Sequence, residues 1–134
     1  MTVKVGACTD LMTDIQLNLV VIRASNLERS IAFYRLLGLD FVKHRHGNGL
    51  EHFACDLGTV VFEIYPRTSE ADSTSATRLG FRVASVDTAI AELEKQGVPV
   101  ISPPKNSLWG WRAVVTDPDG HKVELTELKQ QGER

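Results

Sequence analysis

The sequence predicts an α+β fold: two tandem βαβββ modules that form a half-open, cup-shaped mixed sheet with the helices on the outside. The pattern strand, helix, strand, strand, strand fits residues 16–65 and fits again to residues 77–126. A polar stretch rich in Ser, Thr and Ala, residues 66–76, separates them and predicts a linker. An internal repeat decides the architecture more firmly than any single element. With 134 residues, the chain has the size of one domain, which we take to span residues 1–134.

The first module is expected to begin with a strand over residues 16–23, where the run Leu19-Val20-Val21-Ile22 predicts burial on both faces. Ser25 and Glu28 have the spacing of a capping box, so we expect Ser25 to cap the following helix. That helix carries Leu27, Ile31, Tyr34 and Leu37 on one stripe, and Gly38 closes it. Strands are then expected over residues 39–45, 50–56 and 59–65.

The second module repeats this order after the linker. We expect a strand over residues 78–84, with Leu79, Phe81 and Val83 facing a helix, and then a helix over residues 87–96 with Ile90 and Leu93 inward. A short strand over residues 98–101 and a proline-bearing loop over residues 102–106 follow. Strands over residues 111–116 and 121–126 end the module, joined by the tight turn Asp117-Pro118-Asp119-Gly120.

Composition excludes several classes of protein. The formal net charge of −2 gives no field that would draw the chain onto nucleic acid or an anionic membrane. No apolar run approaches the length of a membrane span, and the N-terminal residues do not have the pattern of a secretory signal. Cys8 and Cys55 are too few for a disulfide framework, so we expect reduced thiols and a cytoplasmic protein.

Superposing the two modules brings two glutamates into corresponding positions. Glu63 and Glu124 lie on the last strand of their modules, while Leu19 and Arg78 lie on the first. Glu63 is surrounded in sequence by Val61, Phe62 and Ile64, so we expect it to be at least half buried. The inner, concave face between the modules is then the natural place for a ligand.

Three segments, residues 17–34, 78–83 and 117–125, resemble the vicinal oxygen chelate superfamily, which includes glyoxalase I, extradiol dioxygenases and bleomycin-resistance proteins. Metal-using members of that superfamily place a histidine on the first strand of each half and a glutamate on the last. Here the histidine positions hold Leu19 and Arg78, and neither side chain ligates a divalent metal. The resemblance is therefore closest to metal-free bleomycin-resistance-like members, and we expect no metal and no cofactor.

Arg78 is expected to replace the charge of that metal by forming an ion pair with Glu63, with Glu124 or with both. Arg82 and Lys122 alternate onto the same face, which predicts a partly cationic cavity for a polar or anionic molecule.

The cluster Trp109-Gly110-Trp111-Arg112 adds two indoles and a guanidinium that can contact a planar ligand. The sequence leaves open which tryptophan faces the cavity. His44 and His46 are expected to be solvated, His121 to be structural, and His52 to be a candidate base or ligand. The expected ligand contacts are Leu19, Glu63, Arg78, Arg82, Trp109, Trp111, Arg112 and Glu124.

These residues predict a metal-free protein that binds a small drug-like or metabolite molecule, aromatic or polar, in the manner of bleomycin-resistance proteins. The alternative is a glyoxalase-like lyase or isomerase, in which Glu63 or Glu124 removes a proton next to a carbonyl and Arg78 stabilises the enolate. A third possibility is a metal-dependent protein with unconventional ligands such as His52. The resemblance also implies a homodimer with the cavity near or across the interface, where Glu63 and Arg78 of different chains could meet.

Overall fold

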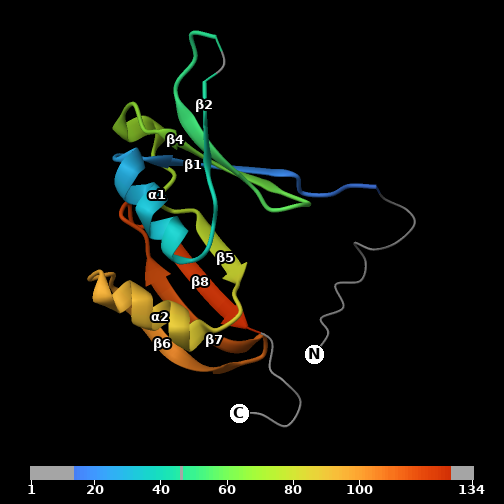
Figure 1. Cartoon of the computed structure of the whole chain (residues 1–134), viewed down its shortest axis with the longest axis vertical. Coiled ribbons are helices and arrows are strands. Elements are labelled where there is room, and N and C mark those ends of the chain that lie inside the picture. The colour runs from blue at the N-terminus through green and yellow to red at the C-terminus, as the bar shows by residue number, and fades with distance from the viewer. Residues whose placement is uncertain (1–13, 46, 128–134) are drawn as a thin grey trace.

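The computed structural model describes residues 14–45 and 47–127, which form two four-stranded mixed sheets with one α-helix each (Figure 1). The first sheet has the order β1-β4-β3-β2 and the second the order β5-β8-β7-β6. In each sheet the outer strand and its neighbour, β1 with β4 and β5 with β8, run parallel, and the remaining pairs are antiparallel. The predicted fold class, two βαβββ modules in an open α+β arrangement, is confirmed.

The elements follow one another as the repeat predicts. In the first module they are β1 Leu19–Ala24, α1 Leu27–Leu36, β2 Val42–His44, β3 His52–Asp56 and β4 Val61–Pro66. A short 3₁₀ helix, η2 Glu70–Asp72, lies in the linker. The second module comprises β5 Arg78–Arg82, α2 Val86–Lys95, β6 Val100–Ser107, β7 Gly110–Thr116 and β8 Lys122–Glu127.

The cap of α1 differs from the prediction. Asn26, not Ser25, is the N-cap residue, and its side-chain oxygen accepts a hydrogen bond of 3.0 Å from the Arg29 backbone N–H. Ser25 instead donates its backbone N–H to the Asp119 carboxylate in the second module, at 2.9 Å. Gly38 closes α1 with a φ of 103°, as predicted.

The first strand is shorter and more one-sided than predicted. It begins at Leu19, and only Ile22 and Ala24 are fully buried, while Leu19 and Val21 are 49% and 38% exposed. The prediction of burial on both faces is wrong because α1 covers one face of the first sheet and, among the described residues, no helix covers the other. The apolar run of β1 is therefore buried on one face and forms an exposed apolar surface on the other.

The structure also replaces the predicted proline loop by a strand. β6 runs for eight residues through Pro103 and Pro104 and pairs with β7, with register shifts between Val100 and Lys105. Proline is tolerated at these positions because β6 is the edge strand of its sheet and has a neighbour on one side only.

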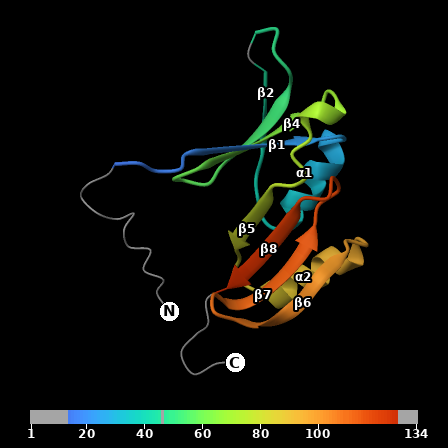
Figure 2. The same ribbon diagram turned by 180° about the vertical axis from the view of Figure 1, so that it is seen from behind.

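The two modules share one hydrophobic core. The ring of Tyr34 on α1 contacts Phe62 of the first sheet and Phe81 of the second, with centroid distances of 5.2 and 6.1 Å, and Phe62 and Phe81 are 5.8 Å apart. Figure 2 shows the second sheet in front of α2, so the viewer looks at the face that carries no helix. We call this face of each sheet its open face.

The predictions about the cysteines and about membrane spans can be compared with the structure. Cys55 is a buried free thiol, whereas Cys8 and His46 lie outside the described residues. Within residues 14–45 and 47–127, neither helix has the length and apolar character needed to cross a membrane.

Candidate functional site

Glu124, on the open face of the second sheet, accepts hydrogen bonds from two arginines. It alternates with Val123 and Leu125, which are buried against α2, so its carboxylate points away from the core. Arg112 donates to Oε1 at 2.9 Å and Arg78 donates to the same oxygen at 3.4 Å. The hydrogen bond from Arg112 is the main reason that the pKa of Glu124 lies below its ordinary value.

The predicted ion pair of Arg78 therefore forms with Glu124, and it does so within one chain. Among the described residues, no ion pair joins Arg78 to Glu63. The closer partner, Arg112, was expected only as a ligand contact. The signal that points to it is the antiparallel pairing of β7 with β8, which sets Arg112 opposite Thr126 and diagonal to Glu124.

Glu63 occupies the corresponding place in the first sheet but has different neighbours. Its side chain is 19% exposed, which agrees with the expected partial burial. The nearest basic group is the imidazole of His52, whose Nε2 lies 3.9 Å from the Glu63 carboxylate. His52 is itself buried, stacked flat on Tyr65 with ring centroids 4.1 Å apart. His52, a candidate base or ligand from the sequence, lies on the same strand face as Ala54, but Tyr65 covers its ring.

Apolar side chains surround Glu63 on the open face of the first sheet. Val21 pairs directly with Glu63 across β1 and β4, and Leu19 lies two residues earlier on the same face. Val42 on β2 is 60% exposed and pairs with Ala54, which in turn pairs with Glu63. This face thus combines exposed aliphatic surface with the carboxylate of Glu63.

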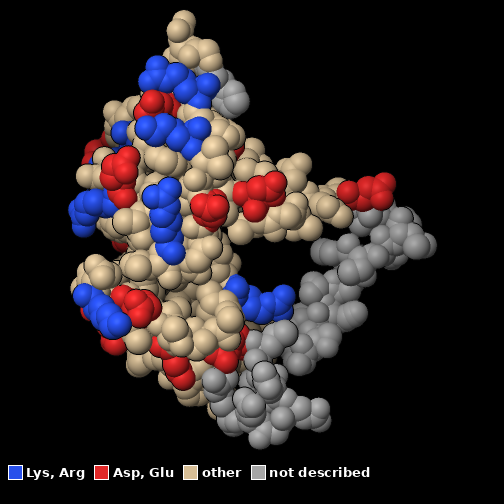
Figure 3. All heavy atoms as spheres, in the orientation of Figure 1, with Lys and Arg blue, Asp and Glu red and all other residues tan. Residues whose placement is uncertain are grey.

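The open face of the second sheet is basic. It carries Arg78 and Arg82 from β5, Arg112 from β7 and Lys122 from β8, together with the carboxylate of Glu124; we call the four basic residues the basic face. Figure 3 shows Lys and Arg atoms beside the end of β5, at the border of a hollow that opens between the two modules.

The two tryptophans point in different directions. The Trp111 indole N–H donates to the Asp87 carboxylate on α2 at 2.8 Å, so its ring lies on the helix side of the sheet. Trp109 lies in the turn between β6 and β7 and is 53% exposed. Trp111 therefore lies away from the basic face, and Trp109 is the tryptophan that remains a candidate for contacting a ligand.

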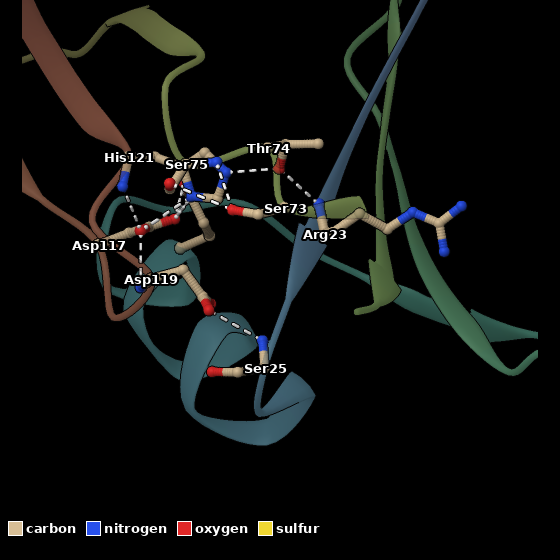
Figure 4. Close-up of polar contacts among 9 residues, drawn as sticks. Arg23, Ser25, Ser73, Thr74, Ser75, Asp117, Asp119 and His121 are labelled. Atoms are coloured by element: carbon tan, nitrogen blue, oxygen red, sulfur yellow. Dashed lines mark hydrogen bonds and ion pairs between the residues drawn. The ribbon is translucent and has the colours of Figure 1, made fainter. Parts of the chain in front are cut away.

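His121, expected to be structural, is the centre of a buried polar network that joins the modules (Figure 4). Its Nδ1 lies 2.8 Å from the Asp117 carboxylate and its Nε2 lies 2.7 Å from the Thr74 hydroxyl in the linker. The Tyr34 hydroxyl donates to Asp117 at 2.7 Å, and Thr74 accepts the backbone N–H of Arg23 at 2.9 Å.

Burial and hydrogen bonding together set the charge state of the groups in this network. Burial alone would raise the pKa of Asp117, but the hydrogen bonds from His121 and Tyr34 outweigh it and hold that pKa below its ordinary value. The pKa of the Tyr34 hydroxyl is raised by its burial and by the neighbouring Asp117 charge. The network therefore keeps Asp117 ionised and Tyr34 neutral, and positions the sheets that carry Glu63 and Glu124.

Two clefts of about 310 and 340 Å³ lie away from the two glutamates. The first lies between the C-terminal ends of α1 and α2 and the turn at Pro118. The second lies between the end of α1, the turn after β3 and the end of β5, where Arg82 forms part of its wall. Neither of these two clefts includes Glu63, Arg78 or Glu124.

The donor set around Glu124 does not fit the metal that the resemblance associates with this place. One carboxylate oxygen already accepts from two guanidinium groups, and permanent cations this close repel a divalent ion. Within the described part of the chain, no group of three or more His, Cys, Asp or Glu side chains is arranged to hold a metal ion.

Comparisons with known proteins agree on the family. Residues 16–125 match the model of the Glyoxalase/Bleomycin resistance protein/Dioxygenase superfamily. An uncharacterized protein of Mycolicibacterium smegmatis is 33% identical over 110 residues, which cover 82% of this chain and 91% of that protein.

Among solved structures, TnmS3, described as an antibiotic binding protein from Streptomyces sp. CB03234, superposes with a TM-score of 0.72 at 26% identity, covering 87% of this chain and 99% of that one. A glyoxalase/bleomycin resistance protein from the same organism superposes with a TM-score of 0.66 at 26% identity, covering 83% of this chain and 99% of its own.

Proposed function

Because the chain belongs to the glyoxalase/bleomycin resistance protein/dioxygenase superfamily, we propose that it is a metal-free protein of the bleomycin-resistance type that binds and sequesters a small aromatic or polar compound. The observation that carries the proposal is the arrangement at Glu124, where two arginines take the carboxylate oxygen that a metal would otherwise need. The similarity to TnmS3, described as antibiotic-binding, supports a binding role over other roles found in the superfamily.

The binding site in this proposal is completed by a second copy of the chain. The open face of the first sheet is apolar with an acidic Glu63, and the open face of the second sheet is basic, so the two surfaces are complementary between copies. Leu19 and Val42, 49% and 60% exposed, would be covered in such a dimer. Facing the two surfaces across a two-fold axis yields two equal cavities, each with an apolar wall and a basic wall.

A mixing experiment tests the shared cavity. Arg78→Gln/Arg82→Gln damages the basic wall, and Leu19→Asp/Val21→Asp damages the apolar wall. In a mixed dimer, one of the two cavities regains both intact walls while the other receives both defects. We expect each variant alone to lose binding of a planar probe such as 9-anthracenecarboxylate, and the re-equilibrated mixture to recover up to about a quarter of the wild-type sites when exchange is statistical.

Tryptophan-fluorescence titration measures the binding and light scattering measures the mass. A monomeric wild-type protein, or a mixture that recovers no sites although mass analysis shows mixed dimers, would contradict the shared cavity. Binding by a monomer would still leave the sequestering role standing, so the two parts of the proposal are tested separately.

In the enzymatic alternative, the two glutamates are not equally suited to act as the catalytic base. Glu124 is a poor proton acceptor because Arg112 and Arg78 hold its pKa down. Glu63, beside His52, is the better candidate for a base. Turnover of a hemithioacetal or similar electrophile by the wild type, lost in Glu63→Gln and kept in Glu124→Gln, would favour a lyase or isomerase over a binding protein.

A further inference from the structure

The basic face has more positive charge than the chain itself neutralises. Arg112 and Arg78 share one carboxylate, that of Glu124, and the Arg78 side chain remains 51% exposed. In the described part of the chain, no ion pair or side-chain hydrogen bond involves Arg82 or Lys122. A guanidinium has five N–H donors and no acceptor, so Arg78 and Arg82 retain donors that only a ligand or water can use.

Comparison of the two modules shows that this surplus is particular to the second one. Register places Arg23 at the position of Arg82, because Val21 pairs with Glu63 as Gly80 pairs with Glu124. Arg23 has partners within its own module and the linker: it donates to the Pro66 carbonyl at 3.1 Å, lies 3.9 Å from Asp72 and covers the Tyr65 ring at 5.3 Å. The same strand position is thus used for internal packing in one module and left available in the other.

Gly80 has no side chain, so the space between the guanidinium groups of Arg78 and Arg82 is not filled at this position. It lies between Arg78 and Arg82 on β5, opposite Glu124 on β8. A Cβ built at Gly80 would meet only the Glu124 carbonyl oxygen, at 4.0 Å, which is ordinary contact. The surface between Arg78 and Arg82, which we call the bay, is therefore formed by backbone atoms, and a ligand group can approach it closely.

We infer that the ligand is a small organic anion, whose carboxylate or similar planar oxyanion lies over Gly80 between Arg78 and Arg82. This inference rests on the proposed function and adds the charge of the ligand to it. Arg112 neutralises the Glu124 carboxylate at 2.9 Å, so Glu124 does not repel the anion strongly. Glu124 also forms the ion pair that holds Arg78 beside the bay. The apolar and aromatic surface of the first sheet suits a flat, uncharged body attached to that acid group.

Three probes that share one ring system test the charge preference: 9-anthracenecarboxylate, the neutral 9-anthracenecarboxamide and the cationic 9-(aminomethyl)anthracene. Tryptophan quenching and calorimetry on the full chain give the dissociation constants. We expect the carboxylate to bind at least about tenfold more tightly than the carboxamide, and the cation to bind most weakly. The advantage of the carboxylate should shrink as salt rises from 50 to 500 mM.

Variants locate the anion. Arg82→Gln should weaken carboxylate binding about tenfold and leave carboxamide binding within twofold. Gly80→Val should block the bay for both probes without unfolding the protein, since the backbone there accepts a side chain. Arg35→Gln on α1 is the matched control: it removes an exposed arginine that lies on a helix and not on the open face of either sheet, and it should change neither constant.

Equal or tighter binding of the cationic probe would overturn the anion inference while leaving the binding function intact. Wild-type carboxylate affinity in both Arg82→Gln and Gly80→Val would also overturn it. Binding of none of the three probes would contradict the proposed function for this ligand class, and the inference with it.

Discussion

The two modules place a glutamate at the same point of the same strand and surround it differently. Residue register makes His52 the counterpart of Arg112, because Ala54 pairs with Glu63 as Val114 pairs with Glu124. The imidazole stays 3.9 Å from Glu63, whereas the guanidinium donates to Glu124 at 2.9 Å. A repeated backbone therefore sets where a carboxylate lies, and one neighbouring side chain decides whether it is held as an ion pair.

The first strands of the modules differ in the same way. Leu19 and Val21 give the first sheet an apolar open face, and Arg78 and Gly80 give the second a basic one that includes the bay. The two open faces therefore differ in chemistry, one apolar with the carboxylate of Glu63 and the other basic, and surfaces of these two kinds are complementary.

The largest expected effect comes from cutting the network that holds the modules in register. Asp117→Ala removes the acceptor of Tyr34 and His121 and leaves both buried groups unsatisfied, so we expect a loss of about 3 kcal/mol in the free energy of unfolding. Urea denaturation measures it. Asp119→Ala, in the same turn, is the control and should cost less than about 1 kcal/mol, since the described hydrogen bond of its side chain is a single one, accepted from the backbone N–H of Ser25.

The second effect compares the two glutamates directly. Glu124→Gln weakens two charged hydrogen bonds at a partly exposed site and should cost about 1 kcal/mol after solvent screening. Glu63→Gln loses only a contact of 3.9 Å and should stay within about 0.5 kcal/mol of the wild type. Equal losses in the two variants would show that the difference between the modules has no energetic weight.

Acid should abolish the contribution of Glu124. Its pKa is lower in the folded state than in the unfolded chain, where it is about 4.3. Stability from such a group is fully present above the unfolded pKa and is lost as pH falls through the folded pKa. The difference in unfolding free energy between wild type and Glu124→Gln should thus be constant above pH about 5.5 and shrink below about 4.3. A difference that does not shrink as the pH falls below about 4.3 would contradict the assignment.

The smallest effect separates the two arginines of Glu124. Removing Arg112 with Arg112→Gln should raise the pKa of Glu124 more than Arg78→Gln does, because Arg112 is the closer donor and the larger cause of the lowered pKa. Carbon-13 NMR titration of the Glu124 carboxyl measures both shifts. A larger rise in Arg78→Gln would instead make Arg78 the principal partner and return its role to the one predicted from sequence.

Much of the fold was predictable because it depends on local patterns that recur. The β-α-β-β-β order, the glycines that close α1 and α2, and the buried stripe of Ile31 and Tyr34 follow from periodicity and turn chemistry. The errors occurred where tertiary context overrides such patterns. The apolar run in β1 predicts burial on both faces, and the prolines in β6 predict a loop, but both segments lie at sheet positions with one uncovered side.

By itself, the sequence determined which residues share the open faces, because alternation along a strand fixes the side on which each side chain lies. It placed Glu63, Glu124, Arg78 and Arg82 there before any contact was known. Only the tertiary structure decided their partners: Arg112 for Glu124, His52 for Glu63, and Asp87 on α2 for Trp111. Partners depend on which strands and helices become neighbours, and that information is carried by the packing of the whole core rather than by any one segment.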